Sequence, residues 1–248
     1  MDKFSATVLS GFLGAGKTTL SKLKKLFTSA CEINDSDLSA PPALEINDFD
    51  LEYLCWIVSL YMRIRNVPGH IAEIGVAKGR NTVYFGKLIK QFNDHNIRQY
   101  IGFDTFSGFT DESLKNDPQL NEYNGAWLEN TKQSVLDRCK DNEVLDVVEI
   151  IEGDACITVP DTLKNYQGKN FRPGKGKFAL LYIDSNAYEP SIQSMENFLE
   201  YMLPGGIIAI DEKLQGGESE AIIDFGKKYN LKVERFGPNE IPMAIVIK

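Results

Sequence analysis

The sequence contains few of the residues that carry metal or thiol chemistry. Its 248 residues include only 2 histidines and 4 cysteines, the latter at Cys31, Cys55, Cys139 and Cys156. No two cysteines form a CxxC pair, and no group of cysteines and histidines has the spacing of a zinc site. We therefore interpret the cysteines as the reduced thiols of a cytoplasmic protein.

Positive charge and long apolar runs are also scarce. The chain has 27 lysines and arginines against 35 aspartates and glutamates, a formal net charge of -8. An acidic surface repels phosphate backbones, so we expect no nucleic-acid partner. No run reaches the roughly 18 apolar residues that span a membrane, and no cleavage site follows the apolar start. We therefore expect no membrane partner and no signal peptide.

The hydrophobic pattern alternates between strand and helix periods from about residue 51 onward. Hydrophobic residues make up 43% of the chain, enough for one domain with a sizeable core. Expected helices lie between most of the expected strands, which are 70–75, 99–104, 146–153, 178–184, 205–211, 231–236 and 243–248. Nearly continuous apolar strands separated by helices indicate a parallel sheet covered on both faces.

The last two expected strands are joined by residues 237–242, GPNEIP, which are too few for a parallel crossover. They should form an antiparallel hairpin at the sheet edge. The predicted fold class is therefore α/β, a doubly wound, mostly parallel, seven-stranded, Rossmann-like sheet with an antiparallel C-terminal hairpin and an N-terminal arm.

In such a sheet, ligands bind beyond the carboxyl ends of the strands. This rule disfavours His70, which begins a strand, and His95, which precedes one. It favours the residues that end strands, namely Glu73, Gly75, Asp104, Asp154, Asp184 and Asp211.

Three of these strand ends indicate a nucleotide-like ligand. Residues 73–81, EIGVAKGRN, place Gly75 and Gly79 in a strand-to-helix turn whose backbone can approach a ligand closely, although a tight turn alone also favours glycine. Asp104 can accept from both hydroxyls of a ribose, and Asp154 from an adenine amino group. A single strand-end aspartate is equally explained as a helix N-cap, but three at one edge favour a ligand site.

The segments EIGVAKG, GFDTFSGF, EGDA, YIDSNAYEPS, LPGGIIAIDE and GGESEAIIDF resemble the class I S-adenosylmethionine-dependent methyltransferases. More narrowly, residues 51–248 resemble the macrocin O-methyltransferase (TylF-type) family. The resemblance implies an S-adenosylmethionine cofactor and a homo-oligomer. It also implies cofactor-binding roles: Glu73, Gly75 and Gly79 for the methionine part, Asp104 for the ribose, and Asp154 with Ala155 for the adenine. Val76 and Thr105 are further expected cofactor-binding residues.

An acid cluster is expected where two neighbouring strands end, at Asp184, Asp211 and Glu212. Three carboxylates that converge without basic partners repel one another, and Mg²⁺ or Ca²⁺ would relieve that repulsion. The resembled family has a metal-binding acid trio at the matching positions. In this chain Asn186 stands at one acidic position of that pattern, and Glu212 stands where the family has an aspartate. The alternative to a metal site is therefore a structural cluster of helix caps and salt bridges.

The expected reaction is methyl transfer to a hydroxyl of a sugar or glycosylated natural product, assisted by Mg²⁺. Asp184 and Asp211 are the predicted catalytic residues, because a carboxylate beside the metal can take the hydroxyl proton. One alternative is a non-catalytic cofactor-binding module, which Asn186 favours. A methyltransferase that acts on a nitrogen or carbon atom is a second alternative, closer to the expected reaction.

Residues 11–18, GFLGAGKT, match a phosphate-binding loop and resemble the start of CobW-type GTPases. In that reading Lys17 contacts phosphates and Thr18 holds Mg²⁺. The chain has no room before Leu51 for the other parts of a nucleotidase. We therefore predict that residues 1–40 form an arm and 41–248 the methyltransferase domain. A remnant phosphate site and a GTPase-like function are the alternatives.

Overall fold

The computed structural model describes residues 48–123, 125, 128–165, 177–211, 216–235 and 243–247, all within the unit Asn47–Lys248. The predicted arm at 1–40, its phosphate-binding loop and Glu212 lie outside the described residues. None of the described helices is long and apolar enough to cross a membrane.

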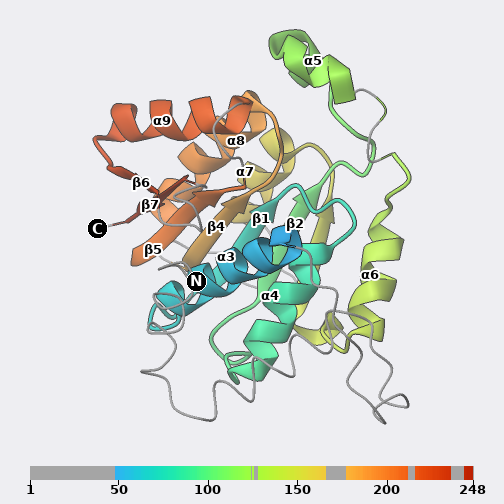
Figure 1. Cartoon of the computed structure of the whole chain (residues 1–248), viewed down its shortest axis with the longest axis vertical. Coiled ribbons are helices and arrows are strands. Elements are labelled where there is room, and N and C mark those ends of the chain that lie inside the picture. Colours follow the sequence, from blue (N-terminus) through green and yellow to red (C-terminus); the bar gives the residue numbers. More distant parts are fainter. Residues whose placement is uncertain are drawn as a thin grey trace. The chain divides into compact units, whose positions relative to one another are not determined.

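The described chain forms a seven-stranded sheet in the order β3-β2-β1-β4-β5-β7-β6 (Figure 1). Its strands are β1 (His70–Ile74), β2 (Tyr100–Asp104), β3 (Val148–Glu152), β4 (Phe178–Ile183), β5 (Met202–Ile210), β6 (Val233–Arg235) and β7 (Met243–Val246). The first five strands pair in parallel, whereas β7 is antiparallel to both β5 and β6. The predicted α/β sheet with its antiparallel C-terminal strand pair is confirmed.

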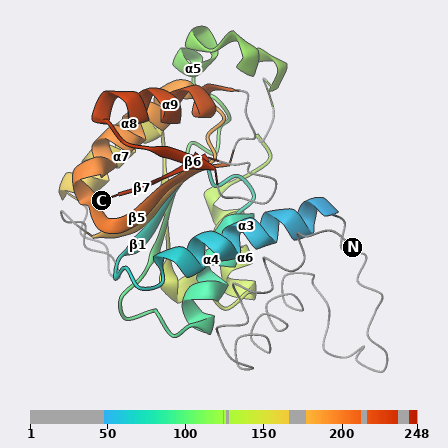
Figure 2. The ribbon, with the colours of Figure 1, turned by 60° about the vertical axis from the view of Figure 1, so that its left-hand side comes forward.

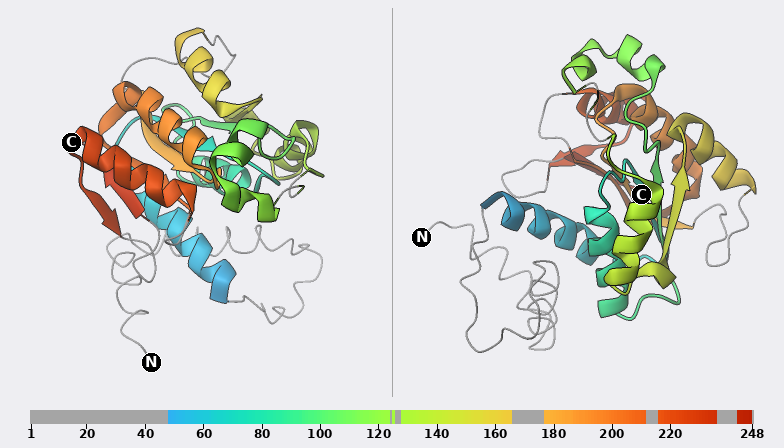
Figure 3. Two further views of the ribbon diagram at one scale, coloured as in Figure 1. Left: turned by 90° about the horizontal axis from the view of Figure 1, so that it is seen from above. Right: turned by 90° about the vertical axis from the view of Figure 1, so that its right-hand side faces the viewer.

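Helices cover both faces of the sheet (Figures 2 and 3). One face carries α3 (Asp48–Ile64), α4 (Arg80–Gln91) and α6 (Lys132–Asp141). The other carries α7 (Ala155–Asn165), α8 (Tyr188–Phe198) and α9 (Gly217–Tyr229). Because central strands such as β4 are covered on both faces, all six of its residues, Phe178–Ile183, are buried. This explains why its sequence is continuously apolar.

One strand begins earlier than the sequence predicts. The strand β5 begins at Met202 rather than at residue 205, directly after the 3₁₀ helix η4 (Leu199–Tyr201), and it includes Pro204. The connection after β2 contains α5 (Asp111–Asn116) and the 3₁₀ helix η2 (Pro118–Tyr123). A last 3₁₀ helix, η3 (Leu145–Val147), leads into β3.

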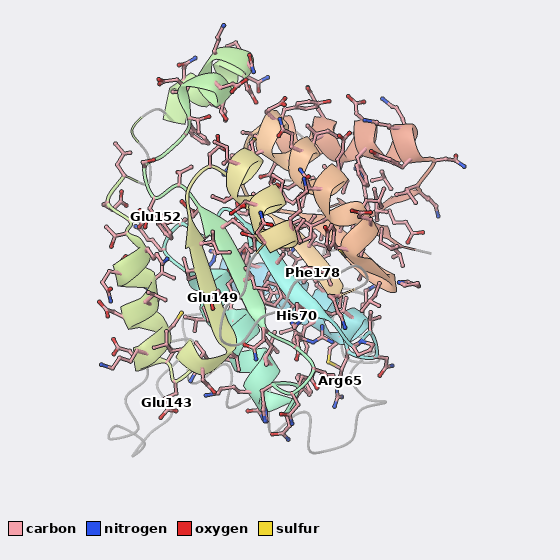
Figure 4. The ribbon with its side chains drawn as sticks, turned by 180° about the vertical axis from the view of Figure 1, so that it is seen from behind. Arg65, His70, Glu143, Glu149, Glu152 and Phe178 are labelled. Atoms are coloured by element: carbon pink, nitrogen blue, oxygen red, sulfur yellow. The ribbon has the colours of Figure 1, made fainter. Side chains whose placement is uncertain are left out.

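The amino end of β1 lies away from the strand ends that were predicted to bind ligand. His70 stacks edge-on against Phe178 with 5.9 Å between ring centroids, and Figure 4 places this pair away from Glu152, the last residue of β3. Burial, together with Arg98 and Lys177, lowers the pKa of His70 to about 4. The placement agrees with a structural role for this histidine.

Candidate functional site

A cavity of about 520 Å³ opens at the carboxyl ends of the parallel strands. Its wall is built from the segments that follow β1, β2, β3, β4 and β5, as the strand-end rule requires. The predicted site residues in its lining are Gly75, Val76, Asp104, Thr105, Asp154, Ala155, Asp184 and Asp211. Glu73 and Gly79 are absent from the lining, and the predicted ligand Glu212 lies outside the described residues.

Gly75 is required by the close approach of two strand ends. Its φ of 89° lies in the left-handed region, and a Cβ atom there would overlap the main-chain carbonyl of Asp184. Its N–H donates to the carbonyl of Phe103 at 2.9 Å. The turn after β1 is therefore clamped between the ends of β2 and β4.

Asp104 organises this turn. Its Oδ2 accepts hydrogen bonds from the backbone N–H groups of Val76 at 2.7 Å and Ala77 at 2.8 Å. Its Oδ1 accepts from the N–H of Phe106 at 2.7 Å. The carboxylate thus holds two loops together and remains in the cavity wall.

Glu73 lies beneath the cavity rather than in its wall. It is fully buried, its Oε1 accepts from Nδ2 of Asn81 at 2.6 Å, and its Oε2 accepts from the hydroxyl of Tyr100. Burial raises the pKa of Glu73 well above its ordinary value. The hydroxyl of Tyr53 donates to Oδ1 of Asn81 at 2.6 Å, so the network extends to α3. Glu73 therefore stabilises the turn after β1 through buried hydrogen bonds.

Gly79 precedes α4 and also lies behind the cavity wall. Its φ is 79°, and a Cβ atom there would come within 2.9 Å of Cγ1 of Val135 in α6. The glycine thus allows α6 to pack closely against the turn.

Asp154 performs the cap role that was the alternative to ligand binding. Its Oδ1 accepts from the N–H of Cys156 at 2.9 Å, and its carbonyl accepts from the N–H of Thr158 at 2.8 Å. Its position in the cavity lining is compatible with a ligand contact as well.

The pair Asp184 and Asp211 follows two adjacent strands. Ile183 pairs with Ile210 in the parallel register of β4 and β5, which confirms that these strands are neighbours. Burial and the nearby Asp211 raise the pKa of Asp184 well above its ordinary value. The hydroxyl of the buried Tyr182 donates to Oδ1 of Asp211.

The expectation that this acid cluster has no basic partner is wrong. Arg80, the first residue of α4, lines the same cavity, and its charge opposes the rise in the pKa of Asp184. Its guanidinium lies 3.6 Å from the ring centroid of Tyr53. Burial lowers the pKa of Arg80, but Tyr53, Asp211 and Asp184 act against it and leave that pKa raised. Arg80 thus acts on the acids through its charge, while its guanidinium contacts the ring of Tyr53.

Asn186, which departs from the resembled acid pattern, has a backbone reason to be asparagine. Its φ of 58° is left-handed, a conformation that asparagine tolerates better than most residues. Its N–H donates to the buried carboxylate of Glu218 at the start of α9. In the described part of the chain, no group of three or more histidine, cysteine or acidic residues is arranged to hold a metal.

Sequence reasoning did not select several side chains that line the cavity, among them those of Arg80, Asn81 and Asn130. Arg80 and Asn81 lie within the segment EIGVAKGRN, so the adjacent helix start was a usable signal. No comparable signal marks Asn130, which follows the long connection after β2.

Comparisons with known proteins agree with this geometry. A family model described as a methyltransferase domain matches residues 72–212. A 4'-O-methyltransferase from Streptomyces olivaceus, acting on 8-demethyl-8-(2,3-dimethoxy-alpha-L-rhamnosyl)-tetracenomycin-C, is 23% identical over 172 residues. That match spans 66% of this chain and 60% of the relative's length.

Two solved structures share the fold. The calicheamicin methyltransferase CalS11 superposes with a TM-score of 0.66 at 24% identity, covering 94% of this chain and 93% of its own. The O-methyltransferase NovP gives a TM-score of 0.66 at 17% identity, with 80% of each chain covered.

Proposed function

Because the chain belongs to the methyltransferase domain family, we propose that it transfers a methyl group from S-adenosylmethionine to a hydroxyl of a sugar or glycosylated natural product. The observation that carries the proposal is one cavity that joins Gly75, Asp104 and Asp154 to the acid pair Asp184 and Asp211. The first three suit a nucleoside, and the acid pair suits proton removal from an acceptor.

The described residues fit the cofactor. Gly75 lies in the cavity lining, and Asp104 offers carboxylate oxygens to ribose hydroxyls. Val76, Thr105, Asp154 and Ala155 complete the predicted contacts, with Glu73 and Gly79 acting from behind the wall. When bound, S-adenosylmethionine supplies a methyl group on a sulfonium, which becomes a neutral thioether as the carbon–sulfur bond breaks.

Asp184 and Asp211 act on the acceptor. One of the two carboxylates takes the hydroxyl proton while the hydroxyl oxygen forms its bond to the methyl carbon. The raised pKa of Asp184 makes its ionised form a stronger base than an exposed aspartate. The hydrogen bond from Tyr182 holds Asp211 in one orientation.

Mg²⁺ is part of the proposal. Asp184 and Asp211 supply hard oxygen donors, and Mg²⁺ is commonly held by one or two carboxylates together with substrate and water. Glu212 is the predicted third ligand. When bound, the ion lowers the pKa of an acceptor hydroxyl. Arg80 supplies a second positive charge to the same acids.

The acceptor class and the protein's setting are further parts of the proposal. A sugar acceptor is supported by the name of the tetracenomycin relative, which modifies a rhamnosyl group, and by that of CalS11, a TDP-rhamnose 3'-O-methyltransferase. We propose residues 41–248 as the catalytic domain, residues 1–40 as an arm, and a cytoplasmic homo-oligomer.

The test is a methylation assay on the full chain. S-adenosylmethionine is offered with a panel of nucleotide-linked deoxysugars and glycosides, in Mg²⁺ or in EDTA, and methylated product is identified by mass spectrometry. The proposal expects a product heavier than its acceptor by one CH₂ group, and Mg²⁺-dependent turnover that Asp211→Asn lowers about a hundredfold. Cofactor binding without turnover on any hydroxyl acceptor would favour a non-catalytic module.

A further inference from the structure

Asn130 is a buried polar side chain in the cavity wall. The residue is only 5% exposed, and it belongs to the lining of the cavity. Among the described residues, Nδ2 of Asn130 has no hydrogen-bond partner. Buried donors are almost always paired, because leaving one unpaired costs stability. An unpaired donor in a cavity wall therefore points to an acceptor atom on a ligand.

The neighbours of Asn130 hold it at the turn after β1. Glu129 pairs with Lys78 of that turn at 3.3 Å, between Oε1 and Nζ. On the other side, Thr131 caps α6, and α6 packs against Gly79 through Val135.

This turn is the one that Asp104 organises, through the N–H groups of Val76 and Ala77. The helix α6 contacts both α4 and β3, and β3 is a sheet neighbour of β2, which ends at Asp104. Asn130, which precedes α6, and Asp104 line the same cavity.

We propose that Asn130 is a second ribose-binding residue, whose Nδ2 donates to a ribose hydroxyl oxygen while Asp104 accepts from the ribose hydroxyls. The inference rests on the proposed function, because it takes S-adenosylmethionine as the ligand. An ionised carboxylate only accepts, whereas a hydroxyl both donates and accepts. Asp104 and Asn130 together satisfy both capacities, which the carboxylate alone does not.

The first experiment is calorimetric titration of the full chain and of its Asn130→Ala variant. The ligands are S-adenosylhomocysteine and 5'-methylthioadenosine, which keeps the ribose but lacks the amino-acid part. A lost neutral hydrogen bond weakens binding about three- to tenfold. The proposal expects this loss, by the same factor, for both ligands. A loss confined to S-adenosylhomocysteine would assign Asn130 to the methionine part and overturn the proposal.

The second experiment removes the hydroxyls instead. The 2'-deoxy and 3'-deoxy forms of 5'-methylthioadenosine are titrated into both proteins. One of these two deoxy ligands should bind equally well to the variant and to the unmodified protein, since it lacks the hydroxyl oxygen that accepts from Nδ2 of Asn130. An undiminished difference with both deoxy ligands would contradict a ribose contact.

Stability separates ligand binding from a structural role. Since Nδ2 has no partner in the described structure, Asn130→Ala should not lower the melting temperature of the ligand-free protein. S-adenosylhomocysteine should, however, raise the melting temperature of the variant by less than it raises that of the unmodified protein. A lower ligand-free melting temperature would overturn the proposal. The matched control is Asn142→Ala at the other end of α6, where the amide donates to the carbonyl of Arg138.

If the unmodified protein does not bind S-adenosylhomocysteine, the proposed function fails as well, whereas equal binding by both proteins rejects only the role of Asn130.

Discussion

The hydroxyl of Tyr53 donates a hydrogen bond to Oδ1 of Asn81 at 2.6 Å, which ties α3 to the helix that follows the glycine turn. Asn81 passes the connection on to Glu73 beneath the cavity. The first described helix is thereby part of the support of the site.

Tyr53→Phe removes this hydrogen bond and leaves the ring in place. Both groups are buried, so the variant should lose about 1 kcal/mol of unfolding free energy, because Oδ1 of Asn81 is left without this donor. Urea denaturation measures the loss. Tyr229→Phe, at a more exposed ring on α9, is the control and should change stability by less than about 0.5 kcal/mol. Equal effects of the two substitutions would contradict the supporting role of Tyr53.

Gly75→Ala should destabilise the protein strongly, by about 3 kcal/mol or more, because the new Cβ atom would overlap the carbonyl of Asp184. Gly125→Ala is the matched control. Gly125 has nearly the same φ, 88°, but nothing lies within 4 Å of its added Cβ atom. It should therefore cost only about 1 kcal/mol. Similar losses at both positions in thermal denaturation would argue against the clamped turn.

His70 predicts how stability depends on pH at the other end of the sheet. Its pKa is about 4 in the folded protein against an ordinary value of 6.5, so the unfolded chain binds more protons between these values. Stability should therefore fall as the pH falls from 6.5 toward 4, and be fully present above 6.5. The contribution is on the order of 3 kcal/mol.

His70→Asn tests this dependence. An asparagine oxygen can still accept from the N–H of Gln99, which donates to Nδ1 of the histidine at 3.2 Å. Urea denaturation at several pH values should give a flatter acid limb for the variant. Parallel curves for the two proteins would show that another group controls this range.

Arg80→Ala should shift the acid limb of kcat/KM to higher pH. Burial and Asp211 raise the pKa of Asp184, and Arg80 opposes that rise, so its removal raises this pKa further. A reaction that needs the ionised carboxylate then requires a higher pH. Arg80→Lys keeps the charge and should shift the limb less. Loss of activity without any shift would instead assign Arg80 to acceptor or cofactor binding.

The sheet and its ligand edge could be predicted from sequence because burial on both faces makes strands such as β4 continuously apolar. The same edge rule correctly brought Asp184 and Asp211 together at the cavity. The rule could not distinguish Glu73 from the residues that line the cavity, because Glu73 also lies at a strand end but is enclosed by Asn81 and Tyr100. Such enclosure depends on side-chain direction, which strand periodicity does not encode.

The residues that sequence reasoning missed depend on tertiary packing. Arg80 lines the same cavity as the acids because α4 begins at that residue, and Asn130 lies in the cavity wall next to α6, which packs on the glycine turn. The short helix α5 could not be predicted from the hydrophobic pattern, because its six residues, DESLKN, carry no apolar period.

The most direct test of the proposed function is calorimetric titration of the full chain with S-adenosylmethionine, and separately with GTP and ATP, each with and without Mg²⁺. We expect micromolar binding of S-adenosylmethionine, lost in Asp104→Ala and kept in Lys17→Ala. Tight, Mg²⁺-dependent binding of GTP or ATP with no binding of S-adenosylmethionine would contradict the account and place the function in residues 11–18.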